Sequence, residues 1–257
     1  QFEILLIIAV MAGAGYAAFS DAHNFPNRWF TRDDAYYYFK VAQNISEGLG
    51  STFDGINLAN GYHPLWMLVN IPVFSLARFD LILPLRILIL LMGAIHAATG
   101  VLFYRLISRV LSPIVGVVIA TFWAFDSFIN ATTAQFGLET GLTAFSIVLF
   151  LYLFQKAEQK WRSDSLTKRD LIVFGLLAVM VMFSRLDTVF LVVLFGFYLV
   201  FRSLPLRYFL LADILGVVFI TFFSFIFRVG MKEYYAYSEA ALTMALLSVV
   251  IALPLFY

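Results

Sequence analysis

The sequence predicts an all-α, polytopic transmembrane helical bundle of about seven or more spans, because the chain is strongly apolar, poor in charge and divided into long hydrophobic runs. Of its 257 residues, 62% are hydrophobic and 13% are charged, and the mean hydropathy is +0.91. Soluble domains are about half apolar and a quarter charged. Lys and Arg stand in short clusters between the apolar runs, as in the loops of membrane proteins. A formal net charge of +1 excludes the basic field of a nucleic-acid-binding protein.

The predicted spans follow from the length of helix that a bilayer requires, which is roughly 20 residues for a hydrocarbon core of about 30 Å. This length marks apolar runs near residues 2–20, 81–104, 112–127, 138–155, 170–184, 187–201 and 208–227, with the start of another at 240–257. Residues 1–257 then form a single transmembrane module with a first span at 1–20, a long polar segment at 21–80 and the remaining spans at 81–257. Because the last apolar run is cut short at Tyr257, we expect the chain to be truncated at its C-terminus.

The segment at residues 62–79 decides the topology. It is apolar, but it begins with His63 and Pro64 and covers only about 17 residues, a length at which interfacial helices compete with spanning ones. If it lies along the interface, the basic residues that follow all fall on one side, which the positive-inside rule makes cytoplasmic. If it spans, the basic loops alternate sides and the rule fails. We therefore expect a long first outer loop, 21–80, that contains juxtamembrane helices.

Asp33 and Asp34 are the first candidates for chemistry in this loop. Two adjacent carboxylates repel each other, so one of them takes up a proton more readily or the pair binds a cation, and either outcome suits a general base or a metal site. The structural alternative is a helix N-terminus, with Thr31 as the N-cap and the two acids in the first turn of a helix that ends near Glu47. The aromatic run that follows, residues 36–39, is typical of an interfacial anchor.

Two further candidates, His63 and Glu139, lie near proline or glycine residues that begin or end helices. Pro64 is placed to begin a helix directly after His63, and this imidazole could bind a phosphate or a carboxylate, or serve as an ordinary satisfied polar group. Glu139 occurs in the sequence Phe-Gly-Leu-Glu-Thr-Gly where a predicted span leaves the outer face. Ionisable groups at such a depth tend to face a water-filled cavity, and the alternative role for Glu139 is a first-turn acid of the next helix.

Arg185 and Asp187 interrupt two apolar runs with a charge pair. A guanidinium at this position could clamp a lipid phosphate through its planar fork, and a structural Arg–Asp pair at a tight turn is the alternative. Asp213, inside a predicted span, is expected to be satisfied by a neighbouring helix. The sequence contains no Gly-rich phosphate loop, no zinc-protease His-Glu pattern and no Ser elbow, and the absence of cysteine excludes disulfides and a Cys nucleophile.

Taken in order, these motifs resemble the polytopic C-type (GT-C) glycosyltransferases. The resemblance covers roughly residues 1–230 and includes the Asp-Asp-Ala-Tyr motif at Asp33, the His-Pro-Leu helix at His63, the Gly-Leu-Glu-Thr turn at Glu139 and the Arg-Leu-Asp corner at Arg185. Within that superfamily the pattern is similar to bacterial and archaeal relatives of the protein O-mannosyltransferases, the aminoarabinose transferase and the arabinofuranosyltransferases. Members normally have further helices and often a soluble outer domain.

The resemblance implies an activity and a place. Such enzymes transfer a sugar from a polyprenyl-phosphate carrier to an acceptor hydroxyl of a glycan, lipid or protein, usually with inversion, on the outer face of a bacterial or archaeal plasma membrane. It makes Asp33, ranked first, or Asp34 the catalytic general base. It makes substrate-binding residues of four others: His63, Glu139, Arg185 and Asp187. Relatives differ in their use of a divalent metal, and because no residues here have clear metal-ligand spacing we predict that no metal or other cofactor is obligatory.

Two other functions remain open at the level of the sequence. A transporter or flippase for lipid-linked sugars would need charged residues near mid-membrane along a path to both faces, and Asp213 is the one residue that offers this. A non-catalytic subunit of a larger membrane complex would keep the fold without the activity. The intact acidic pair Asp33 and Asp34 favours the enzyme. Membrane lipid is an expected partner in each case, and nucleic acid is not.

Overall fold

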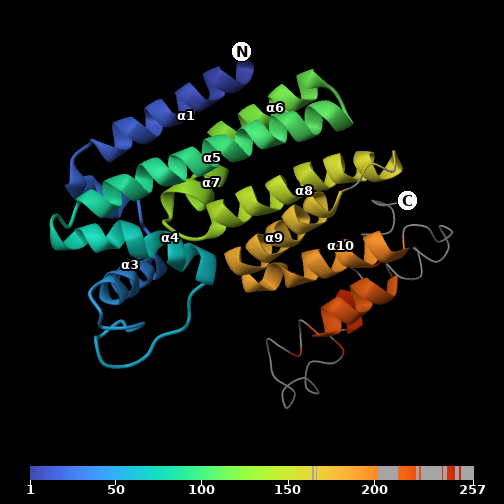
Figure 1. Cartoon of the computed structure of the whole chain (residues 1–257). Coiled ribbons are helices and arrows are strands. Elements are labelled where there is room, and N and C mark those ends of the chain that lie inside the picture. Colours follow the sequence, from blue (N-terminus) through green and yellow to red (C-terminus); the bar gives the residue numbers. More distant parts are fainter. Residues whose placement is uncertain are drawn as a thin grey trace. The chain divides into compact units, whose positions relative to one another are not determined.

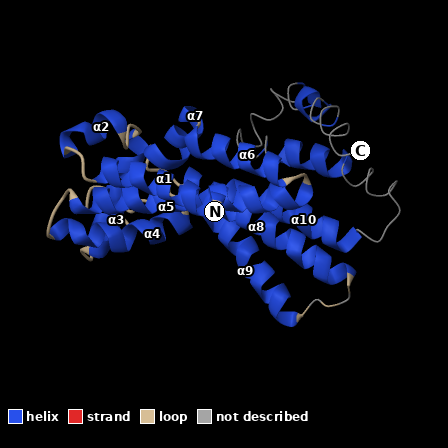
Figure 2. Cartoon of the chain, turned by 90° about the horizontal axis from the view of Figure 1, so that it is seen from above, coloured by secondary structure: helices blue, strands red, loops and turns tan. Residues whose placement is uncertain are grey.

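The computed structural model describes residues 1–163, 165, 167–201, 214–223, 226, 239, 242–246 and 249. The chain divides into two compact units, Gln1–Thr188 and Val189–Tyr257, and each is described by itself. Over the described residues the secondary structure is helical and contains no β-strand (Figure 2). The β-pairing found there is an isolated bridge between Thr52 and Leu58. The predicted all-α fold class is therefore confirmed.

The first unit consists of α-helices joined by loops and by single turns of tighter or wider helix (Figure 1). Its α-helices are α1 (Phe2–Ala18), α2 (Phe25–Arg28), α3 (Asp33–Ser46), α4 (Pro64–Phe74), α5 (Leu83–Val110), α6 (Pro113–Phe125), α7 (Ser127–Asn130), α8 (Thr140–Arg162) and α9 (Lys168–Ser184). The short turns are η1 (Ala22–Asn24), η2 (Ser75–Arg78), the π-helical η3 (Ala131–Gln135) and η4 (Leu186–Thr188). The second unit contains α10 (Val189–Phe201) and a helix at Ile214–Phe223.

Helix α5 lies at the centre of the first unit, with α1, α6 and α8 packed along it (Figure 1). Contact with α1 is very close at Gly93, where an added Cβ would lie 2.5 Å from the Cβ of Ala14. Small residues at such crossings allow helices to pack tightly in membranes, where burial from water does not drive their association. The outer face of α1 carries large exposed apolar side chains, namely Ile4, Leu5 and Ile8. This is the surface expected to face lipid.

Fewer helices than expected are long and apolar enough to cross a membrane. Among the described residues two qualify, Leu83–Val110 and Thr140–Trp161. The number rises to four if each of two bent pairs counts as one span. These pairs are α1 with the following Ala22–Arg28, bent by 103°, and α6 with Ser127–Gln135, bent by 56°.

The predictions of about seven or more spans and of a long first outer loop are therefore not supported. Helix α9 has 17 residues and α10 has 13, whereas a straight crossing takes roughly 20. The apolar composition of these segments predicted spans, but composition does not determine where each helix ends. The predicted spans at 208–227 and 240–257 fall partly or mostly outside the described residues.

The segment at residues 62–79 forms the short helix α4, which rises about 17 Å over its 11 residues and is too short to cross a bilayer. Pro72 lies inside it, and the chain tightens directly afterwards into η2. Helix α4 packs instead on α3 and on the start of α5. Their shared core consists of Tyr38, Phe39, Trp66, Met67, Phe74, Leu88, Ile89 and Met92.

Charged residues gather at both ends of this first unit. Where α5 and α8 end and α9 begins, Arg109 donates to the Tyr152 hydroxyl over 3.2 Å and Lys160 pairs with Asp170 over 2.6 Å. Arg105 also lies at this end and donates two hydrogen bonds to the carboxylate of Glu3, at 2.8 and 2.6 Å. The start of α8 and the end of α9 form the other end.

Candidate functional site

Glu139 is held at the start of α8 by a tight turn that follows η3. Gly137 in this turn has φ of +76°, in the left-handed region that favours glycine. A Cβ at Gly137 would lie 2.6 Å from a ring carbon of Phe30 and 3.1 Å from the Cβ of Ala35. The backbone of the turn therefore lies directly against the first turn of α3, and no side chain fits between them.

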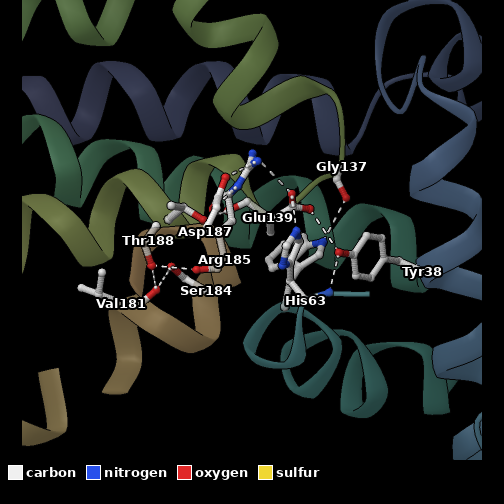
Figure 3. Close-up of polar contacts among 11 residues, drawn as sticks. Tyr38, His63, Gly137, Glu139, Val181, Ser184, Arg185, Asp187 and Thr188 are labelled. Carbon is white, nitrogen blue, oxygen red and sulfur yellow. Dashed lines mark hydrogen bonds and ion pairs between the residues drawn. The ribbon is translucent and has the colours of Figure 1, made fainter. Parts of the chain in front are cut away.

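The Glu139 carboxylate is the centre of a polar cluster that joins four segments of the chain (Figure 3). Only 8% of this residue is exposed. The Tyr38 hydroxyl donates to its Oε2 over 3.2 Å. Its Oε1 lies 3.5 Å from His63 Nε2 and 3.8 Å from a terminal nitrogen of Arg185. A buried carboxylate needs such partners, because the charge would otherwise be expensive to remove from water.

Tyr38 links α3 to both other sides of the cluster. Besides donating to Glu139, its oxygen accepts a hydrogen bond from the backbone N–H of His63 over 2.9 Å. Burial raises the pKa of the Tyr38 phenol, and the negative charge of Glu139 raises the pKa further, so the hydroxyl stays protonated and donates. The sequence does not single out Tyr38, because this residue stands in an aromatic run that is typical of an interfacial anchor.

His63 stands immediately before α4, and its position is fixed from both directions. Pro64 occupies the first turn of the helix, as predicted. One turn on, the Trp66 indole N–H donates to the carbonyl of Gly137 over 3.1 Å, so that α4 is tied to the turn that carries Glu139. The Nδ1 atom of His63 is buried and has no hydrogen-bond partner among the described residues.

Arg185 and Asp187 form the corner that ends α9. The guanidinium donates from Nε and from a terminal nitrogen to the two carboxylate oxygens of Asp187, at 3.2 and 3.0 Å. These bonds raise the pKa of the Arg185 guanidinium, and the charge of Glu139 acts in the same direction. Thr188 closes the corner, because its hydroxyl lies 2.7 Å from the carbonyl oxygens of both Val181 and Arg185. The planar fork is thus aimed with its remaining terminal nitrogen at Glu139 (Figure 3).

Asp33 and Asp34 occupy the first turn of α3 with exposed side chains. Neither carboxylate forms an ion pair with the cluster among the residues that the structure describes, and Asp33 accepts instead from the backbone N–H of Asp34 over 3.1 Å. The helix begins where predicted, but its N-cap residue is Arg32 rather than Thr31. The structural alternative, two acids in a helical first turn, is therefore satisfied.

The first turn of α3 is nevertheless fixed against the Glu139 turn. The Phe30 N–H donates to the carbonyl of Gln135 over 2.7 Å, and the Arg32 guanidinium lies over the Phe136 ring, 4.7 Å from its centre. Asp34 precedes Tyr38 by four residues, so it shares the face of α3 that bears the cluster. Asp33 is displaced to the side of the helix that bears Tyr37. The helical phase thus makes Asp34 the better placed of the two acids.

The cluster combines acid, base and donor groups in a small space. Two carboxylates, Glu139 and Asp187, face one guanidinium, so Arg185 is balanced and one acidic charge is left over. Within the described residues no group of three or more His, Asp or Glu side chains is arranged to hold a metal ion. The prediction that no metal is obligatory stays a prediction. Asp213, on which the transporter alternative depended, lies outside the described residues.

Comparisons with known protein families, with curated proteins and with solved structures found no match to this chain. All four predicted substrate-binding residues, from three separate parts of the sequence, nevertheless lie in one cluster: His63 and Arg185 lie beside the Glu139 carboxylate, and Asp187 is bonded to Arg185.

Proposed function

We propose that this chain is a multi-pass membrane glycosyltransferase, which transfers a sugar from a polyprenyl-phosphate carrier to an acceptor hydroxyl on the outer face, with inversion. The observation that carries the proposal is the meeting of His63 and Arg185 at the Glu139 carboxylate, with Asp187 joined to the cluster through Arg185. The resemblance to the GT-C glycosyltransferases implies that these residues bind the substrate, with Arg185 and His63 at the leaving phosphate. Their meeting at one end of a helical bundle is what that role requires.

In this proposal an acid in the first turn of α3 is the general base. The acceptor hydroxyl gives its proton to the carboxylate as its oxygen attacks the anomeric carbon. The bond from that carbon to the phosphate oxygen breaks, and the polyprenyl phosphate leaves with the electron pair. We assign this role to Asp34, because it shares the face of Tyr38, and keep Asp33 as the alternative. Both are exposed, which leaves them accessible to an acceptor.

Arg185 and His63 are the proposed partners of the leaving phosphate. A guanidinium and an imidazole can donate to the oxygens on which negative charge develops, and preorganised donors of this kind contribute strongly to catalysis. The terminal nitrogen of Arg185 that faces Glu139 is only loosely engaged, at 3.8 Å, so a phosphate oxygen could replace that contact. Glu139 then acts as a positioning residue that holds both donors before the substrate arrives.

The proposed side of the membrane rests on the basic residues that gather where α8 ends and α9 begins. The basic groups of Arg105, Arg109, Lys156, Lys160 and Arg169 belong to one end of the first unit, and Glu139 and Arg185 belong to the other. Under the positive-inside rule the basic end is cytoplasmic, which puts the cluster on the outer face. The Glu139 end would then meet a carrier lipid with its sugar phosphate in the outer leaflet.

A transfer assay with a panel of polyprenyl-phosphate sugars tests the proposal. We expect Asp34→Asn to lower kcat by about 10²–10⁴-fold, the usual contribution of a general base. Asp54→Asn is the matched control, since Asp54 is an exposed acid of the same segment whose carboxylate accepts hydrogen bonds from Ile56 and Asn57. Unchanged turnover in both Asp33→Asn and Asp34→Asn would refute the catalytic assignment. A parent chain that assembles normally but is inactive with every donor would favour the non-catalytic subunit.

A further inference from the structure

A second site lies at the basic end of the first unit, in a groove between α8 and α9. Three cationic side chains line it, Lys156 and Lys160 from α8 and Arg169 from α9. Its volume is about 160 Å³, which suits a phosphate group with a few waters rather than a drug-sized ligand, whose pockets measure roughly 300–1,000 Å³. The groove is separated from Glu139 by roughly 25 Å along α8, at 1.5 Å per residue.

The charge in this groove is not balanced. Asp170 is the one acidic residue of its lining, and it is already paired with Lys160 over 2.6 Å. Lys156 lies over the Tyr152 ring, 4.6 Å from its centre, and Arg169 forms no ion pair with any residue that the structure describes. Among the described residues, two cationic groups are therefore left without a carboxylate partner.

The position of Arg169 adds an independent argument. It occupies the first turn of α9, next to Lys168, where the helix dipole is positive and favours anions over cations. The capping box formed by Thr167 and Asp170 satisfies the helix N-terminus itself but leaves this repulsion in place. An anion bound at Arg169 would interact favourably with the guanidinium and with the helix dipole together.

The remaining walls of the groove are apolar and continue onto an exposed apolar surface of α9. Val173, Phe174 and Leu177 line its α9 side. On the same helix, Ile172 and Leu176 are 64% and 65% exposed. A ligand that combines a phosphate with hydrocarbon chains matches both parts, whereas a free anion would use only the first.

We propose that the groove between α8 and α9 binds the phosphate headgroup of an anionic phospholipid, with the acyl chains lying along the apolar face of α9. This site goes beyond the proposed glycosyl transfer and does not depend on it. Basic pockets between membrane helices on the cytoplasmic side are suited to anionic headgroups. The bound lipid would hold the end of α8 to the start of α9 and so fix the helix that carries Arg185 at its other end.

Native mass spectrometry of the full chain, released from detergent, measures the affinity directly. We expect dioleoylphosphatidylglycerol to bind more tightly than dioleoylphosphatidylcholine. Arg169→Gln and Lys156→Gln should each lower the affinity for phosphatidylglycerol by about five-fold, because a cation near an anionic lipid contributes about 1 kcal/mol to binding. Lys168→Gln is the matched control, since it removes the same charge from the same helical turn but does not line the groove.

Three results would overturn the inference. Equal binding of the two lipids by the wild-type chain would show that the groove does not select an anionic headgroup. An equal loss in Lys168→Gln and Arg169→Gln would show a general charge effect rather than a site. Full competition by inorganic phosphate would identify a soluble anion as the ligand in place of a lipid.

Discussion

Tyr38 is the residue at which three helices meet through hydrogen bonds. Its hydroxyl donates to Glu139 at the start of α8 and accepts from the N–H of His63 at the start of α4. A single oxygen therefore satisfies one buried carboxylate and one backbone donor. Neither partner can turn to water without opening the cluster.

We expect Tyr38→Phe to lower the free energy of unfolding by about 1–3 kcal/mol, the cost of leaving buried polar groups without a partner. Transfer activity should fall as well, because Glu139 and His63 lose their common anchor. Thermal unfolding in detergent and the transfer assay measure the two effects. Tyr36→Phe is the control, since Tyr36 is 42% exposed and lies outside the cluster. Equal stability of the two variants would contradict the linking role of Tyr38.

Asp54 offers a test of the electrostatics outside the cluster. The N–H groups of Asn57 and Ile56, together with the Asn57 side chain, donate to its carboxylate and lower the pKa of Asp54 from 3.8 to about 2. Because the pKa is lowered in the folded loop, the stabilisation is complete above the ordinary value near 3.8 and is lost as the pH falls through about 2. A carbon-13 titration of the aspartate side chains, with Asp54→Asn to assign the signal, should give this midpoint. A midpoint near 3.8 would show that the turn is not formed.

The sequence predicts which types of residue form the candidate site better than it predicts which of several similar neighbours takes part in it. Glu139, Arg185 and Asp187 can be selected because charged groups are rare and expensive beside apolar runs. Tyr38 cannot be selected in this way, since it is one of three consecutive tyrosines and only the helical phase and a partner 101 residues away distinguish it. The same phase favours Asp34 over Asp33, a choice that the motif alone ranked the other way.

At the scale of elements, the turn from η3 into α8 controls where Glu139 lies. Its closest contact is the approach of Gly137 to Phe30 and Ala35 in the segment that leads into α3. The sequence predicts that α3 runs to about Glu47 and that Pro64 begins α4, because caps, glycines and prolines are local signals. It does not predict the π-helical turn at Ala131–Gln135, which has no local signal of that kind.

Gly137→Ala should therefore be more harmful than a glycine change with a similar backbone but open surroundings. We expect a loss of about 3 kcal/mol in the free energy of unfolding, from the left-handed backbone and the overlap with Phe30 together. Gly50→Ala is the control, with φ of +71° and no atom within 4 Å of an added Cβ. It should cost about 1–2 kcal/mol. Chemical denaturation of both variants in the same detergent measures the difference, and equal losses would refute the close packing of the turn.

At the scale of the whole molecule, the fold class follows from composition but the number of crossings does not. Hydropathy identifies the apolar runs, and α5 and α8 are long enough to span. Helix α9 ends after 17 residues at the Arg185 corner, and α4 ends after 11. These lengths depend on tertiary contacts, such as the bonds that Thr188 makes to the end of α9, and a hydropathy scan does not include them.

The orientation of the first unit can be tested directly, because the natural chain has no cysteine. Two variants each introduce a single cysteine at an exposed position. Asn60→Cys lies in the loop before α4, and Ser163→Cys lies directly after α8. In intact cells we expect a membrane-impermeant maleimide to label the first and to reach the second only after lysis. Labelling of both in intact cells would refute the assignment of the two ends of the unit to opposite faces of the membrane.

The Glu139 cluster can be completed only late in the synthesis of the chain. Tyr38 and His63 emerge from the ribosome long before Glu139, and Arg185 follows later still. The bonds that join Tyr38, His63 and Glu139 can therefore form before Arg185 and Asp187 have been synthesised. A nascent chain arrested before the end of α9 would leave Glu139 without the Arg185 guanidinium, so the cluster is complete only when the Arg185 corner has folded against it.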